Sequence, residues 1–586
     1  MPGSTATRDR IPPHLRQYAA EQDYGAYDEI DQAVWRFILL QTWARLQHTA
    51  HPAYARGLAQ TGIDVERIPR ISEMDRCLAA YGWGAVAVDG FIPPRAFQEF
   101  QALGILTIAG AIRTPEHLAY TPAPDIVHES AGHAPILPDP VYREYLRRFG
   151  AIGARAFSSP RDRHVYQAIH RLSELKEDPA AEASEIAEAD ADLVRAQQGG
   201  AGPSEATLLS RLHWWTVEYG LVGTPADYRL YGAGLLSSLG ESHFCHDPAV
   251  AKLPLSAACV ETDYDITKPQ PQLFVAEDFE QLGDVLEEVA GGLAQERGGA
   301  LALERALASE EVATLELDSG LAVTGVLTSV AGGSAEAAYL SLRGPCALSR
   351  GGHILDGHGP AAHPEGYGTP LGRLAEGEAL ARLGEADLAR YAQPGRPRRL
   401  LLRYRSGVRV EGRLERALCD PEGRLLLLSL SDCTVERGGE RLFDPSWGSY
   451  DLAAGESVRA ARAGPADPAF WPESAFPSAR VPSARERSGA SRELLGLYRE
   501  ALRLWEQPRA PELVAGFEAL AAELRRRFPD EWLLPWNLLE CLRKLSRGDA
   551  LASALRRDLL AIEARFPREA PISTGLRTLD ERHPGA

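Results

Sequence analysis

The sequence has no uninterrupted apolar run of the roughly 20 residues that a membrane-spanning helix needs, and it has no excess of basic residues. Its 63 Lys and Arg are outnumbered by 81 Asp and Glu, so the formal net charge is −18. Because non-specific nucleic-acid binding needs a basic surface, this balance argues against it. Residues 1–11 are polar and show no secretory signal. We therefore expect a cytoplasmic protein with neither membrane nor nucleic-acid partners.

Cysteine is also scarce. It occurs at seven positions, an odd number, and no Cys-x-x-Cys pair is present. Scattered cysteines of this kind are typical of free thiols in a reducing compartment rather than of a disulfide framework. The chain of 586 residues is too long for one hydrophobic core, so about two to four domains are expected.

The first half of the chain is predicted to be mainly helical. From Asp28 to Gln47 apolar residues recur at helical spacing, and similar patterns continue to about residue 295. Short extended stretches such as Gly84–Val88 interrupt them. We expect residues 1–298 to form a mainly α domain, a helical basket with short strands.

The second half of the chain is predicted to begin with strands rather than helices. The pattern Ser-Gly-x-x-Val-x-Gly-x-Leu begins at Ser319 and again at Ser406, each time inside an alternating apolar segment that predicts a strand hairpin. We interpret residues 299–460 as a small all-β domain built from a duplicated hairpin. Residues 461–491, rich in Pro, Ala and Ser, are predicted to be a linker, and residues 492–586 a helical C-terminal segment.

The strongest chemical signal is His-Glu-Ser-Ala-Gly-His at residues 128–133. Zinc proteases place two histidines four residues apart, about 40° around a helix, so that both face the metal. His128 and His133 are five apart, about 140° on a regular helix, and cannot both face one ion there. Gly132 could end the helix and let His133 fold back. The spacing therefore argues against a zinc hydrolase and for a site at a helix end.

A third ligand is still needed, and Glu218 is the candidate. It lies in the apolar run Trp214–Leu221, where a carboxylate is costly to bury unless it is paired or bound to a metal. The residues alone leave open the alternative that Glu218 lies on the solvent side of a helix. Two imidazoles and one distant carboxylate are the ligand set of open-sided, redox-active iron sites.

Three blocks of sequence decide between these alternatives. They are residues 90–97 with their continuation to 125, the His-Glu-x-x-Gly-His-x-Pro core at 128–135, and Trp-Thr-Val-Glu-Tyr-Gly-Leu at 215–221 followed by Tyr-Gly-Ala-Gly-Leu-Leu-Ser-Ser at 231–238. Together they resemble the catalytic domain of the pterin-dependent aromatic amino acid hydroxylases, over roughly residues 81–279. From the resemblance we expect no counterpart in that family for the β domain and the C-terminal helices, and no amino-acid-sensing regulatory domain before the catalytic part.

The resemblance implies a cofactor pair, Fe(II) and a tetrahydropterin, and a role for each matching residue. It implies His128, His133 and Glu218 as iron ligands and Glu129, Ser237 and Glu241 as catalytic residues, the last two orienting a histidine ligand. It implies pterin contacts by Phe97, Ile92, Glu129 and His213, with Phe97 stacked on the pterin ring. It implies that Arg113 clamps the carboxylate of the substrate amino acid. The other substrate contacts that it implies are Thr121, Pro124, Asp125, Trp214, Ser237 and Ile266.

Two positions depart from the family pattern on the cofactor side. Position 107 is Thr where many relatives carry His, and position 213 is His where Tyr is common. The substrate assignment depends on two others. Trp214 resembles the branches that hydroxylate phenylalanine and tyrosine, and Ile266 suits an unsubstituted ring better than the Asp of the tyrosine branch.

The resemblance therefore implies a monooxygenase that converts L-phenylalanine to L-tyrosine with O2. A tryptophan 5- or tyrosine 3-hydroxylase is the near alternative, and a scaffold protein with a degenerate catalytic domain is a more distant one. Three further histidines, His353, His358 and His363, lie in a Gly/Pro-rich segment of the β region. We interpret them as a surface loop rather than a second metal site, because no carboxylate or thiol frames them convincingly in the sequence. The role of residues 300–586 and the oligomeric state cannot be read from the sequence.

Overall fold

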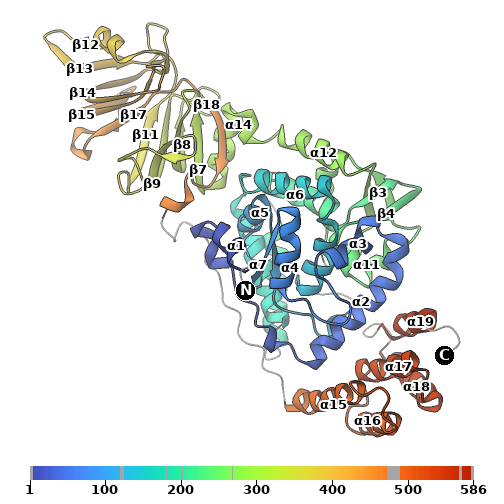
Figure 1. Ribbon diagram of the computed structural model, residues 1–586. Coiled ribbons are helices and arrows are strands. Elements are labelled where there is room, and N and C mark those ends of the chain that lie inside the picture. Colours follow the sequence, from blue (N-terminus) through green and yellow to red (C-terminus); the bar gives the residue numbers. More distant parts are fainter. Residues whose placement is uncertain are drawn as a thin grey trace.

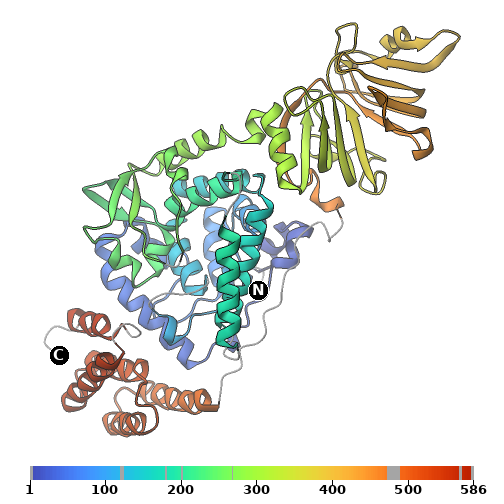
Figure 2. The same cartoon turned by 180° about the vertical axis from the view of Figure 1, so that it is seen from behind.

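The computed structural model describes residues 4–90, 92–118, 124–177, 181–198, 202–266, 268–471, 489–566 and 571–582. A helical body occupies the middle, a β region projects from one end, and the C-terminal helices lie against the body at the other (Figure 1). The same order along the long axis is seen from behind (Figure 2). This confirms the predicted fold class of helices, then strands, then helices. No described helix is long and apolar enough to cross a bilayer.

The helical body is built from short and medium helices around one core. They are α1 (Ser4–Arg10), α2 (Glu29–Thr49), α3 (Pro52–Gln60), α4 (Ile71–Leu78), α5 (Pro94–Ala102), α6 (Pro140–Gly153), α7 (Pro160–Glu177), α8 (Ala183–Gln197), α9 (Glu205–His213), α10 (Ala233–Ser237), α11 (Glu241–Phe244) and α12 (Glu280–Ala290). Helix α2 begins at a capping box, in which Asp28 accepts from the Asp31 backbone and Asp31 from that of Asp28. Its Val34, Trp35 and Phe37 are all fully buried, because other elements cover it on several sides.

Two small sheets belong to this body. The strands β1 (Gly84–Val88) and β2 (Ile105–Ala109) pair in parallel. The second sheet has the order β4-β3-β6-β5, with β3 (Leu221–Thr224), β4 (Asp227–Leu230), β5 (Ala251–Pro254) and β6 (Gln272–Ala276). Strand β3 begins three residues after Glu218, so this sheet anchors the segment that carries that carboxylate.

The helices α13 (Ala294–Arg297) and α14 (Gly299–Ser309) lead into two antiparallel six-stranded sheets. The first has the order β10-β9-β8-β7-β18, with β11 paired to β9; its strands are β7 (Val312–Leu317), β8 (Leu321–Ala331), β9 (Tyr339–Arg350), β10 (His353–Ile354), β11 (Gly366–Pro370) and β18 (Val458–Ala463). The second has the order β12-β13-β14-β15-β16, with β17 paired to β15; its strands are β12 (Ala392–Gln393), β13 (Arg396–Arg403), β14 (Val408–Cys419), β15 (Leu425–Arg437), β16 (Glu440–Phe443) and β17 (Tyr450–Ala453).

The repeated sequence pattern folds the same way twice. Gly320 and Gly407 make the turns between β7 and β8 and between β13 and β14, with φ of 80° and 85°. The later glycine of each copy, Gly325 or Gly412, lies at a shift in strand register. A Cβ atom there would lie 2.5 Å from Cys346 Sγ in the first copy and 3.0 Å from Cys433 Cβ in the second. The duplication therefore includes a glycine–cysteine contact between neighbouring strands.

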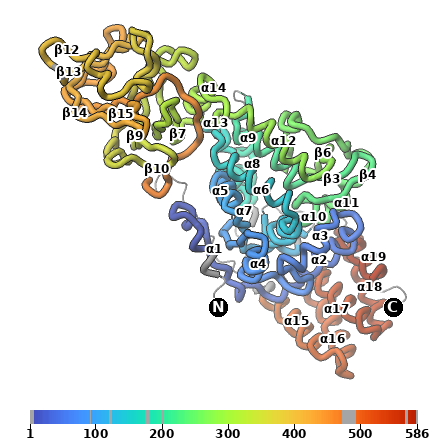
Figure 3. Tube along the Cα trace, turned by 45° about the horizontal axis from the view of Figure 1, so that its top comes forward, coloured from blue at the N-terminus to red at the C-terminus, as the bar shows by residue number. Residues whose placement is uncertain are grey.

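The C-terminal helices share the core of the helical body. They are α15 (Gly489–Trp505), α16 (Leu513–Arg527), α17 (Leu533–Leu545), α18 (Asp549–Arg565) and α19 (Ile572–Arg582). Helices α15, α17 and α19 contact α2, and α16 and α18 pack on these three (Figure 3). Phe37 of α2 packs edge-on against Trp532 and Trp536, with ring centroids 5.0 and 4.7 Å apart. Most of the predicted linker, residues 472–488, lies outside the described residues.

Candidate metal centre

A π-helix carries the two histidines. Residues Val127–His133 form this element, not a regular helix that ends at Gly132 as the sequence analysis expected. In a π-helix the hydrogen bonds join residues five apart, so positions i and i+5 lie about one turn apart on the same face. His128 and His133 therefore face one point without any fold-back, and their Nε2 atoms lie 3.1 Å apart.

Gly132 has a different role from the one expected. It lies within the π-helix, and a Cβ atom at this position would be 2.7 Å from the carbonyl oxygen of Ala233 in α10. Only glycine lets the π-helix approach α10 this closely. The approach matters because α10 ends with Ser237, which contacts His128.

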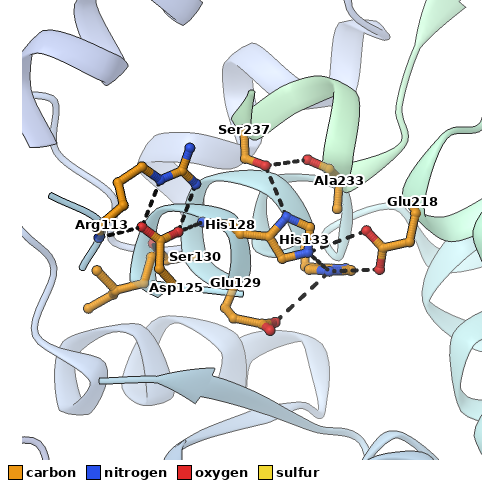
Figure 4. A network of polar contacts seen from close by, with 10 residues as sticks. Arg113, Asp125, His128, Glu129, Ser130, His133, Glu218, Ala233 and Ser237 are labelled. Atoms are coloured by element: carbon orange, nitrogen blue, oxygen red, sulfur yellow. Dashed lines mark hydrogen bonds and ion pairs between the residues drawn. The ribbon is translucent and has the colours of Figure 1, made fainter. Parts of the chain in front are cut away.

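Glu218 also comes from a π-helix, Trp214–Glu218, which continues α9. Its Oε2 lies 3.3 Å from His128 Nε2 and its Oε1 lies 3.4 Å from His133 Nε2 (Figure 4). The alternative in which this carboxylate faces solvent is therefore wrong for this structure. Burial alone would raise the pKa of Glu218, but the adjacent His133 and His128 lower it well below its usual range.

These three side chains can hold one ion. Their ligand atoms all lie within 4.8 Å of one another. Ligands bound at about 2.1 Å and at right angles lie roughly 3.0 Å apart, and the separations of 3.1, 3.3 and 3.4 Å are close to that value. Two imidazoles and one carboxylate on one side of an ion leave positions open on the other, the arrangement of non-haem Fe(II) oxygenases.

Ser237 fixes the orientation of His128. The Ser237 hydroxyl donates to the carbonyl oxygen of Ala233 at 2.7 Å, so it accepts from Nδ1–H of His128 at 3.0 Å. A proton on Nδ1 leaves Nε2 unprotonated and directed at the cluster, as a metal ligand requires. The backbone N–H of His128 donates to Asp125 Oδ1 at 3.0 Å and fixes the start of the π-helix.

Arg113 and Asp125 form a buried pair beside this element. Nε and Nη2 of Arg113 each donate to one Asp125 oxygen at 2.8 Å, and the Arg113 backbone N–H donates at 2.9 Å. Their side chains are 2% and 4% exposed. Burial alone would raise the pKa of Asp125, but Arg113 lowers it below its usual range. No described residue is hydrogen bonded to Nη1 of Arg113.

Aromatic rings stack on one another at the segment that carries Glu218. Trp214 stacks on Tyr264 with centroids 4.3 Å apart and planes 10° apart, and on Tyr219 at 4.6 Å. Tyr264 was not among the residues predicted from the sequence, although it lies two residues before Ile266, which is half-buried. Pro124 is exposed, and Thr121 lies outside the described residues.

The predicted cofactor side centres on His213, at the end of α9. Its Nδ1 lies 3.8 Å from Glu218 Oε1, and its ring contacts Phe97 edge-on with centroids 5.8 Å apart. Burial lowers the pKa of His213 to about 4, so the ring is neutral at pH 7. Its Nε2 is buried without a hydrogen-bond partner among the described residues. Ile92 packs at the edge of a neighbouring apolar cluster, and Thr107 is buried in β2.

Two carboxyl groups nearby have raised pKa values. Burial raises the pKa of Glu129 to about 8 although His133 opposes the shift, and the two side chains approach to 3.9 Å. Burial raises the pKa of Glu241 to about 7. The structure gives the Glu241 carboxyl no hydrogen bond to a described residue, so its role in orienting a histidine stays a prediction.

The chain is similar to known proteins over the part that carries this site. A family model described as biopterin-dependent aromatic amino acid hydroxylase matches residues 20–166 and 180–298. A phenylalanine-4-hydroxylase from Chromobacterium violaceum is 31% identical over 277 residues, which are 47% of this chain and 75% of that protein. One from Pseudomonas aeruginosa is 30% identical over 282 residues, 46% of this chain and 89% of that protein. A crystal structure of the C. violaceum phenylalanine hydroxylase with bound iron(III) and 7,8-dihydrobiopterin is 28% identical and covers 47% of this chain and 85% of that one, with a TM-score of 0.37.

Proposed function

The chain belongs to the biopterin-dependent aromatic amino acid hydroxylase family, and on that premise we propose that it converts free L-phenylalanine to L-tyrosine with Fe(II), a tetrahydropterin and O2. The observation that carries the proposal is the convergence of His128, His133 and Glu218 on one point. These side chains would bind the iron, and iron and reduced pterin together supply the activation of O2.

Arg113 is the residue that we assign to the carboxylate of the substrate. Asp125 holds its guanidinium from one edge through two hydrogen bonds, which fixes the plane of the group before a ligand arrives. The remaining Nη1 donors can then bind a second carboxylate without a further loss of side-chain freedom. Because Asp125 also accepts from the His128 backbone, the amino-acid clamp and the metal ligands are connected through one side chain.

The ring preference rests on Trp214 and Ile266. Trp214, stacked on Tyr264, offers a rigid aromatic wall for an apolar ring. Ile266 offers no hydrogen-bonding group to a phenolic or indole substrate. The relatives named phenylalanine-4-hydroxylase agree with this preference. A tryptophan 5- or tyrosine 3-hydroxylase is the second candidate, because the same cluster would serve all three reactions.

The direct test is the full chain loaded with Fe(II) and tetrahydrobiopterin in air and offered phenylalanine, tyrosine and tryptophan separately, with products identified by mass spectrometry. We expect tyrosine from phenylalanine, and we expect Glu218→Ala to lose iron and activity while Glu188→Ala, an exposed change on α8, keeps both. Hydroxylation of tryptophan or tyrosine in preference would overturn the substrate. No product from any of the three would overturn the function.

We propose a catalytic unit of residues 1–298, a β unit of residues 299–460, a linker of residues 461–491 and a helical unit of residues 492–586. Two of these bounds need adjustment, because strand β18 continues to Ala463 and helix α15 begins at Gly489, inside the predicted linker. We also propose the cytoplasm as the compartment. In support of this, all seven cysteines are free, as expected in a reducing environment. Gel filtration and fractionation of cells that make the protein would test the compartment and give the oligomeric state.

A further inference from the structure

The segment between β10 and β11 brings two histidines back onto the first sheet of the β region. Leu348 N–H of β9 donates to the carbonyl oxygen of His358 at 2.9 Å, and Cys346 N–H donates to that of His363, also at 2.9 Å. The two rings stack with planes 14° apart and centroids 5.8 Å apart. The interpretation as a simple surface loop is therefore wrong for this pair, whereas His353 is exposed.

A carboxylate from a distant part of the chain frames the pair. Asp451 lies on β17, in the second sheet, and its Oδ2 is 3.6 Å from His358 Nδ1 and 3.9 Å from His363 Nε2. Its other oxygen accepts from the Ser429 hydroxyl at 2.6 Å, which directs Oδ2 at the two rings. The side chains of His358, His363 and Asp451 are only 12%, 11% and 14% exposed.

The facing atoms have no other partner. His358 Nδ1 and His363 Nε2 are buried without a hydrogen bond to any described residue. Buried polar atoms in this state are costly, and their persistence calls for an explanation such as a bound ion. The distances of 3.6 and 3.9 Å are too long for good hydrogen bonds. They are close to the roughly 3.4 Å that separates two ligands of a tetrahedral ion with bonds of about 2.1 Å.

We propose that His358, His363 and Asp451 bind a divalent transition-metal ion, Zn²⁺ being the best match, that joins the two sheets of the β region. Imidazole and carboxylate donors suit such an ion, and three protein ligands leave its fourth position open. A small cavity lined by Leu355, Asp356, His358, Arg416 and Ser429 adjoins the cluster and offers a route for the ion. This site is separate from the hydroxylase centre and does not depend on the proposed reaction.

Metal counting on the full chain tests the proposal. The protein is stripped with a chelator, dialysed against ZnCl2 and analysed by elemental mass spectrometry, with circular dichroism as a check of folding. Because Zn²⁺ also suits the ligands at His128, His133 and Glu218, we expect two equivalents in the wild type. Asp451→Asn and His363→Ala should each bind one equivalent fewer, whereas His353→Ala, the matched histidine outside the cluster, should keep both.

The design separates the two sites. The Glu218→Ala protein should still bind one equivalent of zinc, and the double variant Glu218→Ala/His363→Ala should bind none. If Asp451→Asn does not fold, His363→Ala and the wild-type count decide the question. Zinc retention by His363→Ala equal to that of His353→Ala, or a wild-type count of one that Glu218→Ala abolishes, would overturn the proposal.

Discussion

The hydroxyl of Ser237 lies 3.0 Å from Nδ1 of His128 and donates its own proton to the Ala233 carbonyl. The pair holds the imidazole in the tautomer and orientation in which Nε2 binds metal. Partners of this kind are worth about 10- to 100-fold in metal affinity. Ser237→Ala should therefore release Fe(II) to a competing chelator at about 10- to 100-fold lower chelator concentration.

The neighbouring serine provides the control for that change. Ser238 Oγ accepts only from the Glu241 backbone N–H among the described residues, at 3.2 Å. Ser238→Ala should leave iron affinity close to that of the wild type. Equal iron affinities for Ser237→Ala and Ser238→Ala would show that the hydrogen bond to His128 does not tune the metal.

Arg113 and Asp125 lead to a prediction about substrate affinity. Arg113→Lys keeps the charge but loses the planar pair of donors that Asp125 orients. A charge-assisted hydrogen bond contributes about 1.5–3 kcal/mol, so the KM for phenylalanine should rise about 10- to 100-fold while the bound iron stays at one equivalent. Arg147→Lys, at an exposed pair with Glu144, should change neither. A fall in kcat at unchanged KM would contradict the assignment of Arg113 to the substrate carboxylate.

The three side chains of the candidate metal centre, His128, His133 and Glu218, could be singled out from the sequence because each lies in a short, distinctive segment. The helix geometry could not be predicted, because residues five apart face different directions on a regular helix. Both ligand segments are π-helices, and no residue pattern in Val127–His133 distinguishes a π-helix from a regular one. The five-residue spacing of His128 and His133 was the one sign of a π-helix in the sequence. A helix that ends at Gly132 explained the same spacing, so the π-helix was not predicted.

Long-range contacts were the other limit. The duplicated hairpins could be predicted because glycines at fixed offsets mark turns and bulges locally. The contact of Asp451 with the two histidines joins different sheets, and only the folded chain creates it. Likewise, the apolar residues of α2 predicted burial, but periodicity does not say that the covering helices come from the opposite end of the chain.

Glu241 gives a prediction about pH. Burial raises its pKa from 4.5 to about 7 in the folded state. A carboxyl with a raised pKa contributes stability that is fully present below its unfolded pKa and is lost as the pH rises through the folded value. Glu241→Gln cannot ionise, so at pH 8.5 it should be more stable than the wild type by on the order of 2–3 kcal/mol, and the difference should vanish near pH 4.

Chemical denaturation of the metal-free proteins at several pH values measures this difference in the free energy of unfolding. Glu261→Gln is the control, because that exposed side chain stays in water when the chain folds. The free energy of unfolding of Glu261→Gln should differ from that of the wild type by about the same amount at every pH. A Glu241→Gln curve parallel to the wild type from pH 4 to 8.5 would mean that the carboxyl is not buried.

Gly132 gives a steric prediction. In Gly132→Ala the new methyl group would lie 2.7 Å from the Ala233 carbonyl oxygen, so α10 must move and carry Ser237 away from His128. Iron affinity and the unfolding temperature should therefore fall together. Gly283→Ala in α12 meets no atom within 4 Å and should stabilise the protein by about 0.5–1 kcal/mol. Iron titration and thermal unfolding of both variants check this, and a Gly132→Ala protein with wild-type iron affinity would contradict the steric argument.

The C-terminal helices should be needed for the stability of the hydroxylase part. Trp536 of α17 is fully buried against Phe37, while Arg36 pairs with Glu540 at 2.8 Å and Thr578 donates to Gln41 at 2.6 Å. Removing a buried tryptophan side chain costs about 3–5 kcal/mol. Because the two parts share one core, Trp536→Ala should shorten the half-life of hydroxylase activity on heating, although α17 contributes no residue to the metal cluster.

The same reasoning applies to a truncated chain, since ending it at residue 298 or 488 would expose Phe37 and leave Arg36 without Glu540. We expect such proteins to lose thermal stability and to aggregate at temperatures where the full chain is active. Trp447→Ala is the matched control, because that tryptophan is 64% exposed on the β region. Inactivation rates at several temperatures compare the two variants. If Trp536→Ala and Trp447→Ala lose activity at the same rate, the C-terminal helices pack on the helical body without stabilising it.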